Sequence, residues 1–165
     1  MYRWRSYAAL GLLISFSVIG GAAAQNSANP IAVKAVAEVE QPAHEHGRDT
    51  TKLAAAERVV SGDAVIYTLE VRNTGAATVP APTVTYPVPT HMIYTADSAV
   101  GPATLVTYSV DGGQSFDVPE NLKITRSGAE PRQAAAADYT HIRWQLKNAL
   151  KGNSVAFVRF RARVK

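Results

Sequence analysis

Apolar and polar side chains alternate with a period of two along most of this chain, which is the pattern of half-buried β-strands. The clearest segments cover residues 64–73 and 155–164. Their apolar sides consist of Val65, Tyr67, Leu69 and Val71 in the first and of Ala156, Val158, Phe160, Ala162 and Val164 in the second. Residues 31–40, 106–110 and 142–147 alternate in the same way. No stretch beyond residue 24 has the periodicity of a crossover helix, so the sequence predicts antiparallel sheets.

Turn residues divide the chain into about seven to nine short segments, which is typical of an antiparallel β-sandwich. Asp111-Gly112 predicts a two-residue hairpin turn, with the return strand beginning at Phe116. The segment Thr78–Tyr86 contains two prolines, which cannot donate ladder hydrogen bonds, so it is predicted at a sheet edge.

Three other segments are less regular. Residues 41–51 and 126–138 are predicted to be loops, because they are polar or contain proline and glycine. Lys52–Val60 contains three consecutive alanines, and helix propensity alone favours a short helix there. Its place between a loop and a turn favours instead a strand that pairs with Ile31–Glu40.

The predicted core must stabilise the fold without disulfides, because the 165 residues include no cysteine. The absence of cysteine also excludes an iron–sulfur cluster, a thiolate zinc site and a lipoprotein anchor. The large side chains assigned to the core are Tyr67, Leu69, Tyr108, Phe116, Trp144, Leu146, Phe157 and Phe160.

The N-terminal residues 1–24 are predicted to be a signal peptide. Arg3 and Arg5 precede an uncharged, mostly apolar run, and three alanines then suggest cleavage before Gln25. A retained transmembrane anchor is the alternative, but the apolar run is shorter than the roughly 20 residues that a spanning helix needs. We therefore expect a short polar lead over residues 25–30, one domain over residues 31–165, and an exported protein in the periplasm or at the cell surface.

The run from Val59 to Gly75, which contains Ser61-Gly62-Asp63, Tyr67-Thr68 and Asn73-Thr74-Gly75, resembles a bacterial conserved-repeat family called domain of unknown function eleven. Residues 86–89 and 139–144 resemble a later corner and the penultimate strand of that family. The resemblance implies an immunoglobulin-like sandwich of exported and cell-surface proteins, and it implies no catalytic residue. Tyr86 stands where the family usually has an acidic residue.

The sequence contains no nucleophile elbow, phosphate loop, zinc-protease or dinucleotide motif. We therefore expect a protein that is not an enzyme and needs no cofactor, with a hydrolase built from a dispersed Ser, His and Asp as an alternative. His44 and His46 are the best metal-ligand candidates, with Asp49 or another histidine completing the site. The alternative is that these residues belong to a solvated polar loop and bind no metal.

The best candidate for surface recognition is the basic face formed by Arg159, Arg161 and Arg163 on one side of the last predicted strand. Such a stripe suits an envelope protein or an anionic surface glycan, or it only keeps the strand soluble. Nucleic acid is not an expected partner, because removal of the signal peptide lowers the formal net charge of +4 by two. The strand Ile31–Glu40 is a candidate for self-association.

The sequence thus predicts an exported, non-enzymatic structural or interaction module of the bacterial cell envelope. The alternative is a periplasmic protein that binds a metal or an acidic glycan.

Overall fold

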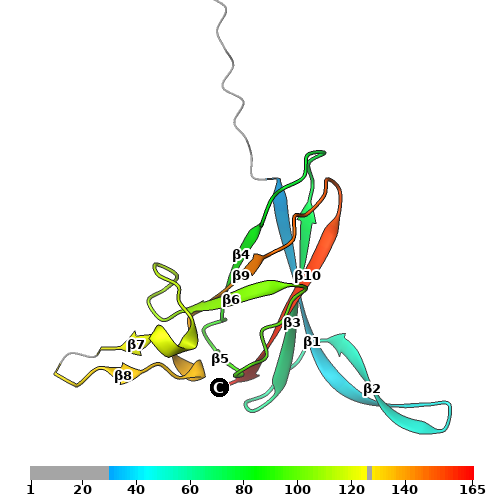
Figure 1. Ribbon diagram of the computed structural model, residues 1–165. Coiled ribbons are helices and arrows are strands. Elements are labelled where there is room, and N and C mark those ends of the chain that lie inside the picture. The colour runs from blue at the N-terminus through cyan, green and yellow to red at the C-terminus, as the bar shows by residue number, and fades with distance from the viewer. Residues whose placement is uncertain (1–29, 126–127) are drawn as a thin grey trace, which may run out of the picture.

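The computed structural model describes residues 30–125 and 128–165, which form two packed antiparallel β-sheets and a small two-stranded ribbon (Figure 1). The predicted signal peptide lies outside the described residues. In the described part of the chain, no helix is long and apolar enough to cross a membrane. The strands are β1 (Ile31–Glu45), β2 (Arg48–Ala55), β3 (Ala64–Asn73), β4 (Thr83–Pro87), β5 (Met92–Tyr94), β6 (Thr104–Ser109), β7 (Lys123–Ile124), β8 (Arg132–Gln133), β9 (His141–Leu146) and β10 (Val155–Val164), with short 3-10 turns η1 (Pro119–Asn121) and η2 (Ala136–Asp138).

The larger sheet has the strand order β2-β1-β3-β10-β5, and the smaller sheet has the order β4-β9-β6. Every strand pair in both sheets is antiparallel. The prediction of an all-β antiparallel sandwich is therefore confirmed. The prediction that Thr78–Tyr86 lies at a sheet edge is also confirmed, because its regular part belongs to the edge strand β4.

The core lies between the two sheets and is centred on Phe160 of β10. This side chain is fully buried, and its ring stacks on Tyr67 with 4.8 Å between centroids. Trp144 of β9 approaches it from the other sheet, with 6.1 Å between centroids. Six of the eight predicted core residues are buried: Tyr67, Leu69, Tyr108, Trp144, Leu146 and Phe160.

Two predicted core residues are placed differently. Phe157 was predicted in the core, and this is wrong, because its side chain is 55% exposed. It shares the alternation of Arg159, so it points away from the other sheet. Phe116 is half-buried, and the Arg143 guanidinium lies 3.5 Å from its ring centroid, which is the geometry of a cation–π contact.

The predicted loop over residues 41–51 is instead most of a long β1–β2 hairpin, which projects beyond the rest of the larger sheet (Figure 1). His46 and Gly47 form its two-residue turn, and both have the positive φ, 51° and 74°, that such turns require. The predicted pairing of Lys52 and its neighbours with β1 is confirmed, but β2 ends at Ala55 rather than continuing to Val60.

The predicted hairpin turn at Asp111 is a longer loop, closed by a bridge between Tyr108 and Asp117. The Asp111 carboxylate holds this loop together by accepting hydrogen bonds from Ser115 and Ser109. These bonds hold the pKa of Asp111 well below its usual range.

The predicted loop over residues 126–138 is more ordered than expected where it is described. It contains β8 and η2, and its Ala134 is buried against the core. The backbone N–H of Ala134 donates to the Leu122 carbonyl, which ties this segment to the residue before β7.

Candidate interaction surface

The candidate site is the side of the larger sheet that faces away from the smaller sheet, called the outer face below. Its side chains alternate with the core residues along three neighbouring strands. They are Ala32, Lys34, Val36, Glu38 and Glu40 of β1, Ala64, Ile66, Thr68, Glu70 and Arg72 of β3, and Val155, Phe157, Arg159, Arg161 and Arg163 of β10. This set contains five basic and three acidic side chains, so the outer face carries an excess of positive charge.

The predicted basic residues Arg159, Arg161 and Arg163 all lie on the outer face, but their environments differ. Arg161 reaches across β3, and its Nη2 lies 2.6 Å from Oε1 of Glu40 on β1. The hydrogen bond from Arg161 lowers the pKa of Glu40 below its usual range. Arg161 is therefore already neutralised within the chain.

Ile66 shows a structural consequence of this ion pair. It belongs to the outer face, yet it is 1% exposed and lies between Glu38 and Arg161 in the cross-strand register. Because long charged side chains cover apolar surface with their aliphatic stems, Arg161 helps to shield Ile66 from water. Arg161 is thus mainly a stabilising residue, which the sequence pattern alone did not distinguish from its two neighbours.

Arg159 and Arg163 are exposed and, in the described residues, form no ion pair. Arg159 donates from Nε to Oγ1 of Thr68 at 3.1 Å, and Arg163 donates from Nη1 to the Gly62 carbonyl at 2.6 Å. Each hydrogen bond orients the side chain and leaves its positive charge uncompensated. These two arginines can therefore receive carboxylate or sulfate groups from a partner.

Three exposed apolar side chains lie near Arg159 on the outer face. Val36 shares its cross-strand row through Thr68, and Val100 is bridged directly to Arg159. Phe157 lies two residues before it on the same face of β10. The exposed fractions are 42% for Val36, 54% for Val100 and 55% for Phe157. This apolar part was not predicted, although Phe157 shares the alternation of Arg159 and the shared alternation indicates it.

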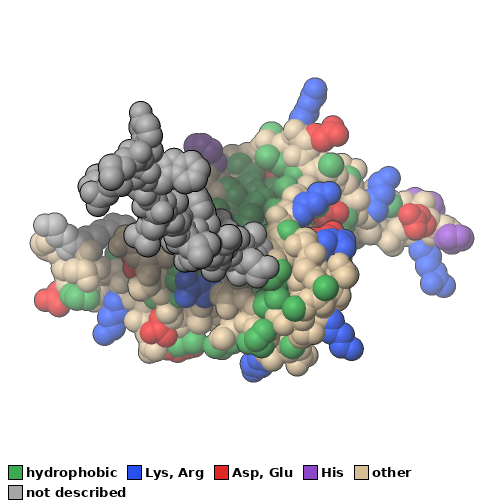
Figure 2. Space-filling model, turned by 90° about the horizontal axis from the view of Figure 1, so that it is seen from above, with side chains coloured by type: hydrophobic (Ala, Val, Ile, Leu, Met, Phe, Trp, Pro, Cys, Tyr) green, Lys and Arg blue, Asp and Glu red, His purple; other side chains and the backbone are tan. Residues whose placement is uncertain are grey.

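The histidine candidates lie at the tip of the β1–β2 hairpin, where Figure 2 shows histidine, basic and acidic side chains gathered together. Nδ1 of His44 lies 2.9 Å from Oδ1 of Asp49, and His46 occupies the turn. Among the described residues, no group of three or more His, Cys, Asp or Glu side chains is placed to hold a metal ion. The structure thus joins His44 to Asp49 without completing the predicted metal site.

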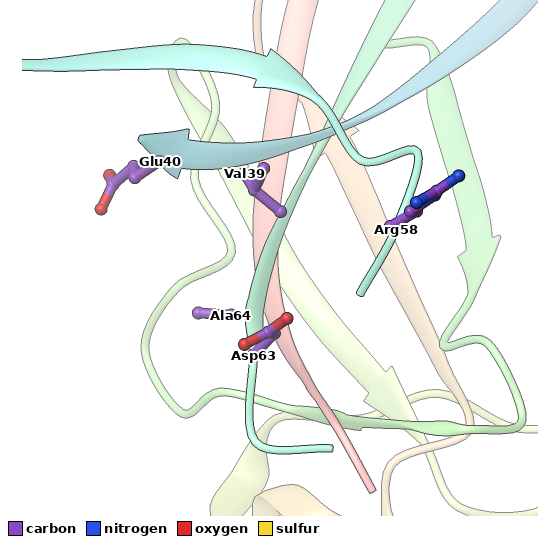
Figure 3. A pocket seen from close by; sticks show the side chains of 5 residues that line it. All are labelled: Val39, Glu40, Arg58, Asp63 and Ala64. Atoms are coloured by element: carbon purple, nitrogen blue, oxygen red, sulfur yellow. The ribbon is translucent and has the colours of Figure 1, made fainter. Parts of the chain in front are cut away.

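A hollow of about 310 Å³ lies beside the hairpin and is lined by Val39, Glu40, Arg58, Asp63 and Ala64 (Figure 3). Figure 3 shows the Glu40 and Arg58 side chains pointing away from each other on either side of Val39. Asp63 accepts a hydrogen bond from the Val60 backbone N–H at 2.8 Å and so closes the turn before β3. In a small-molecule site a few polar groups converge on a common point. The polar groups of this hollow do not converge in this way.

No protein-family model matches this chain, and no characterised protein or solved structure matches it. The resemblance to domain of unknown function eleven therefore stays a prediction.

Proposed function

We propose that this protein is an exported, non-enzymatic interaction module of the bacterial cell envelope, and that the outer face binds an acidic protein partner. The observation that carries the proposal is the pair of uncompensated guanidinium groups on Arg159 and Arg163. Export rests on the predicted signal peptide in residues 1–24.

The apolar surroundings of Arg159 favour a protein partner. Interfaces between proteins are enriched in aromatic and arginine side chains, and their strongest contacts lie where apolar groups exclude water around a polar anchor. Phe157, Val36 and Val100 supply such surroundings for Arg159. A partner with a carboxylate opposite Arg159 and an apolar side chain opposite Phe157 fits this surface.

An acidic glycan is the second candidate partner. The forked guanidinium group suits carboxylate and sulfate, and both Arg159 and Arg163 are accessible on an open sheet face. A glycan of this kind would bind mainly through charge, so its binding should depend on the arginines and not on Phe157.

The test compares two immobilised probes, a random glutamate–tyrosine copolymer and heparin, at low and at physiological salt. We expect the parent protein to bind the copolymer. Changing both Arg159 and Arg163 to alanine should weaken this binding by about tenfold or more, the factor that corresponds to about 1.4 kcal/mol. Phe157→Ala should weaken binding to the copolymer more than binding to heparin.

The matched control changes Arg48 and Lys52 of β2 to alanine, because this removes the same charge from exposed residues of the hairpin. It should leave binding near the parent value. Equal binding by the parent and the Arg159/Arg163 double variant would contradict the proposal, as would an equal loss in the control. If the Arg159/Arg163 double variant loses binding to heparin but not to the copolymer, the result would support the glycan as partner instead.

A further inference from the structure

The described residues fill the strand position beside β1 for only part of its length. On the side of β1 opposite β3, β2 pairs with Glu38–Glu45, and no described strand lies beside residues 32–36. The Ala37 carbonyl accepts a hydrogen bond from the Ala56 N–H, so Ala37 faces the side that β2 occupies. Alternate residues of a strand face the same side, so the backbone groups of Val33 and Ala35 point into the vacant position.

The vacancy also leaves apolar side chains uncovered. Val33 and Ala35 lie opposite Val71 and Leu69 of β3, whose side chains are fully buried in the core. Nevertheless, Val33 is 44% exposed and Ala35 is exposed, because no strand among the described residues lies beside them on that edge of β1. A strand in the vacant position would satisfy their backbone groups and cover their side chains together.

Three other strand edges of the described structure carry features that hinder strand addition. Pro87 places a nitrogen without a hydrogen on the open edge of β4, and Pro42 does the same on the unpaired edge of the β1–β2 hairpin. The edge strand β5 has only three residues. The edge at Val33 and Ala35 has neither protection.

We propose that a second copy of this chain fills the vacancy, with the two β1 strands pairing antiparallel about Val33. Beyond Ala37 the edge of each copy is occupied by its own β2, so each copy offers the other a segment of the same short length. In this register Val33 faces Val33 of the second copy, and each Lys34 faces an Ala32. The proposal does not depend on the outer face binding an acidic partner.

The neighbouring registers are less favourable. Pairing about Lys34 would place two lysines directly opposite each other, which is destabilising. Pairing about Ala35 would place Val33 opposite Ala37, whose carbonyl is already bonded to Ala56. Val33 is therefore the centre that combines apolar contact with a free edge.

The first test measures the oligomeric state of the purified protein by sedimentation velocity over a range of protein concentrations. The range extends to about 1 mM, so that a dimer with a dissociation constant as weak as that is still detected. We expect a concentration-dependent dimer. Ala35→Pro should weaken it by about tenfold or more, because it removes an N–H that no described residue bonds within the chain. Thr85→Pro is the matched control, because the Thr85 N–H faces the open edge of β4. A strict monomer, or an equal dimer in the Ala35→Pro variant, would overturn the proposal.

The second test needs no disruptive change and fixes the register. The chain contains no cysteine, so Val33→Cys introduces a single thiol. In the proposed dimer the two thiols lie in directly opposed residues, at a Cα separation that a disulfide can span. Ala35→Cys places its two thiols about 14 Å apart along the strands. Mild oxidation should cross-link Val33→Cys much faster than Ala35→Cys, and equal rates or the reverse order would overturn the proposal.

Discussion

Replacing Phe160 by alanine tests whether the core lies where the alternation places it. The side chain is fully buried, stacks on Tyr67 at 4.8 Å and meets Trp144 at 6.1 Å between ring centroids. Removing a buried phenylalanine side chain typically costs about 3–5 kcal/mol, since its contacts are lost and a cavity remains. The total stability of a domain is about 5–15 kcal/mol, so we expect Phe160→Ala to remove a large part of it.

Phe157→Ala is the control, because Phe157 lies on the same strand and points to the outer face. A change at this exposed position should alter the free energy of unfolding by only about 0.5 kcal/mol. Urea unfolding followed by tryptophan fluorescence measures both variants, and Trp144 provides a reporter beside Phe160. Equal losses in the two variants, or a larger loss in Phe157→Ala, would refute the assignment of the two faces of β10.

Two other predictions concern buried polar groups. Asn73 is fully buried, and its side chain donates to the Ala77 and Leu150 carbonyls. Asn73→Ala should therefore lower the free energy of unfolding, measured by urea titration, by about 1–3 kcal/mol. An unchanged urea midpoint would contradict this expectation. Burial and the hydrogen bond with Tyr94 raise the pKa of Tyr108 far above its usual range. The pKa of Tyr108 in the folded protein exceeds the unfolded value of about 10, so the neutral side chain stabilises the fold relative to the ionised one. The stabilisation that comes from this pKa difference is complete below about pH 10 and is lost as the pH rises above it. Tyr108→Phe should therefore resist alkaline unfolding, monitored by circular dichroism, to a higher pH than the parent; equal midpoints would contradict the account.

The alternation predicted the central strands because both sheets bury one side of each strand. Residues 64–73 and 155–164 match β3 and β10, and Trp144 and Phe160 meet as expected. The hairpin was missed for the opposite reason. Neither side of its outer half is covered, so burial imposes no period of two, and the turn at His46 and Gly47 is its main local signal.

The candidate site was only partly predictable. Alternation placed Arg159, Arg161 and Arg163 on one face, as the structure does. The pairing of Arg161 with Glu40 joins residues 121 positions apart and depends on β1 lying two strands away, which a local pattern does not encode. Phe157 was assigned to the core by its hydrophobicity, although its position in the alternation indicated the outer face.

A titration of the isotope-labelled protein with the glutamate–tyrosine copolymer, followed by amide chemical shifts, locates the surface that binds an acidic partner. Binding at the outer face predicts that the largest changes fall on β10 and the neighbouring part of β3, around Arg159, and that they fade as salt is raised. Changes concentrated at the hairpin tip, around His44 and Asp49, or in the loop that holds Asp111 would contradict binding at the outer face.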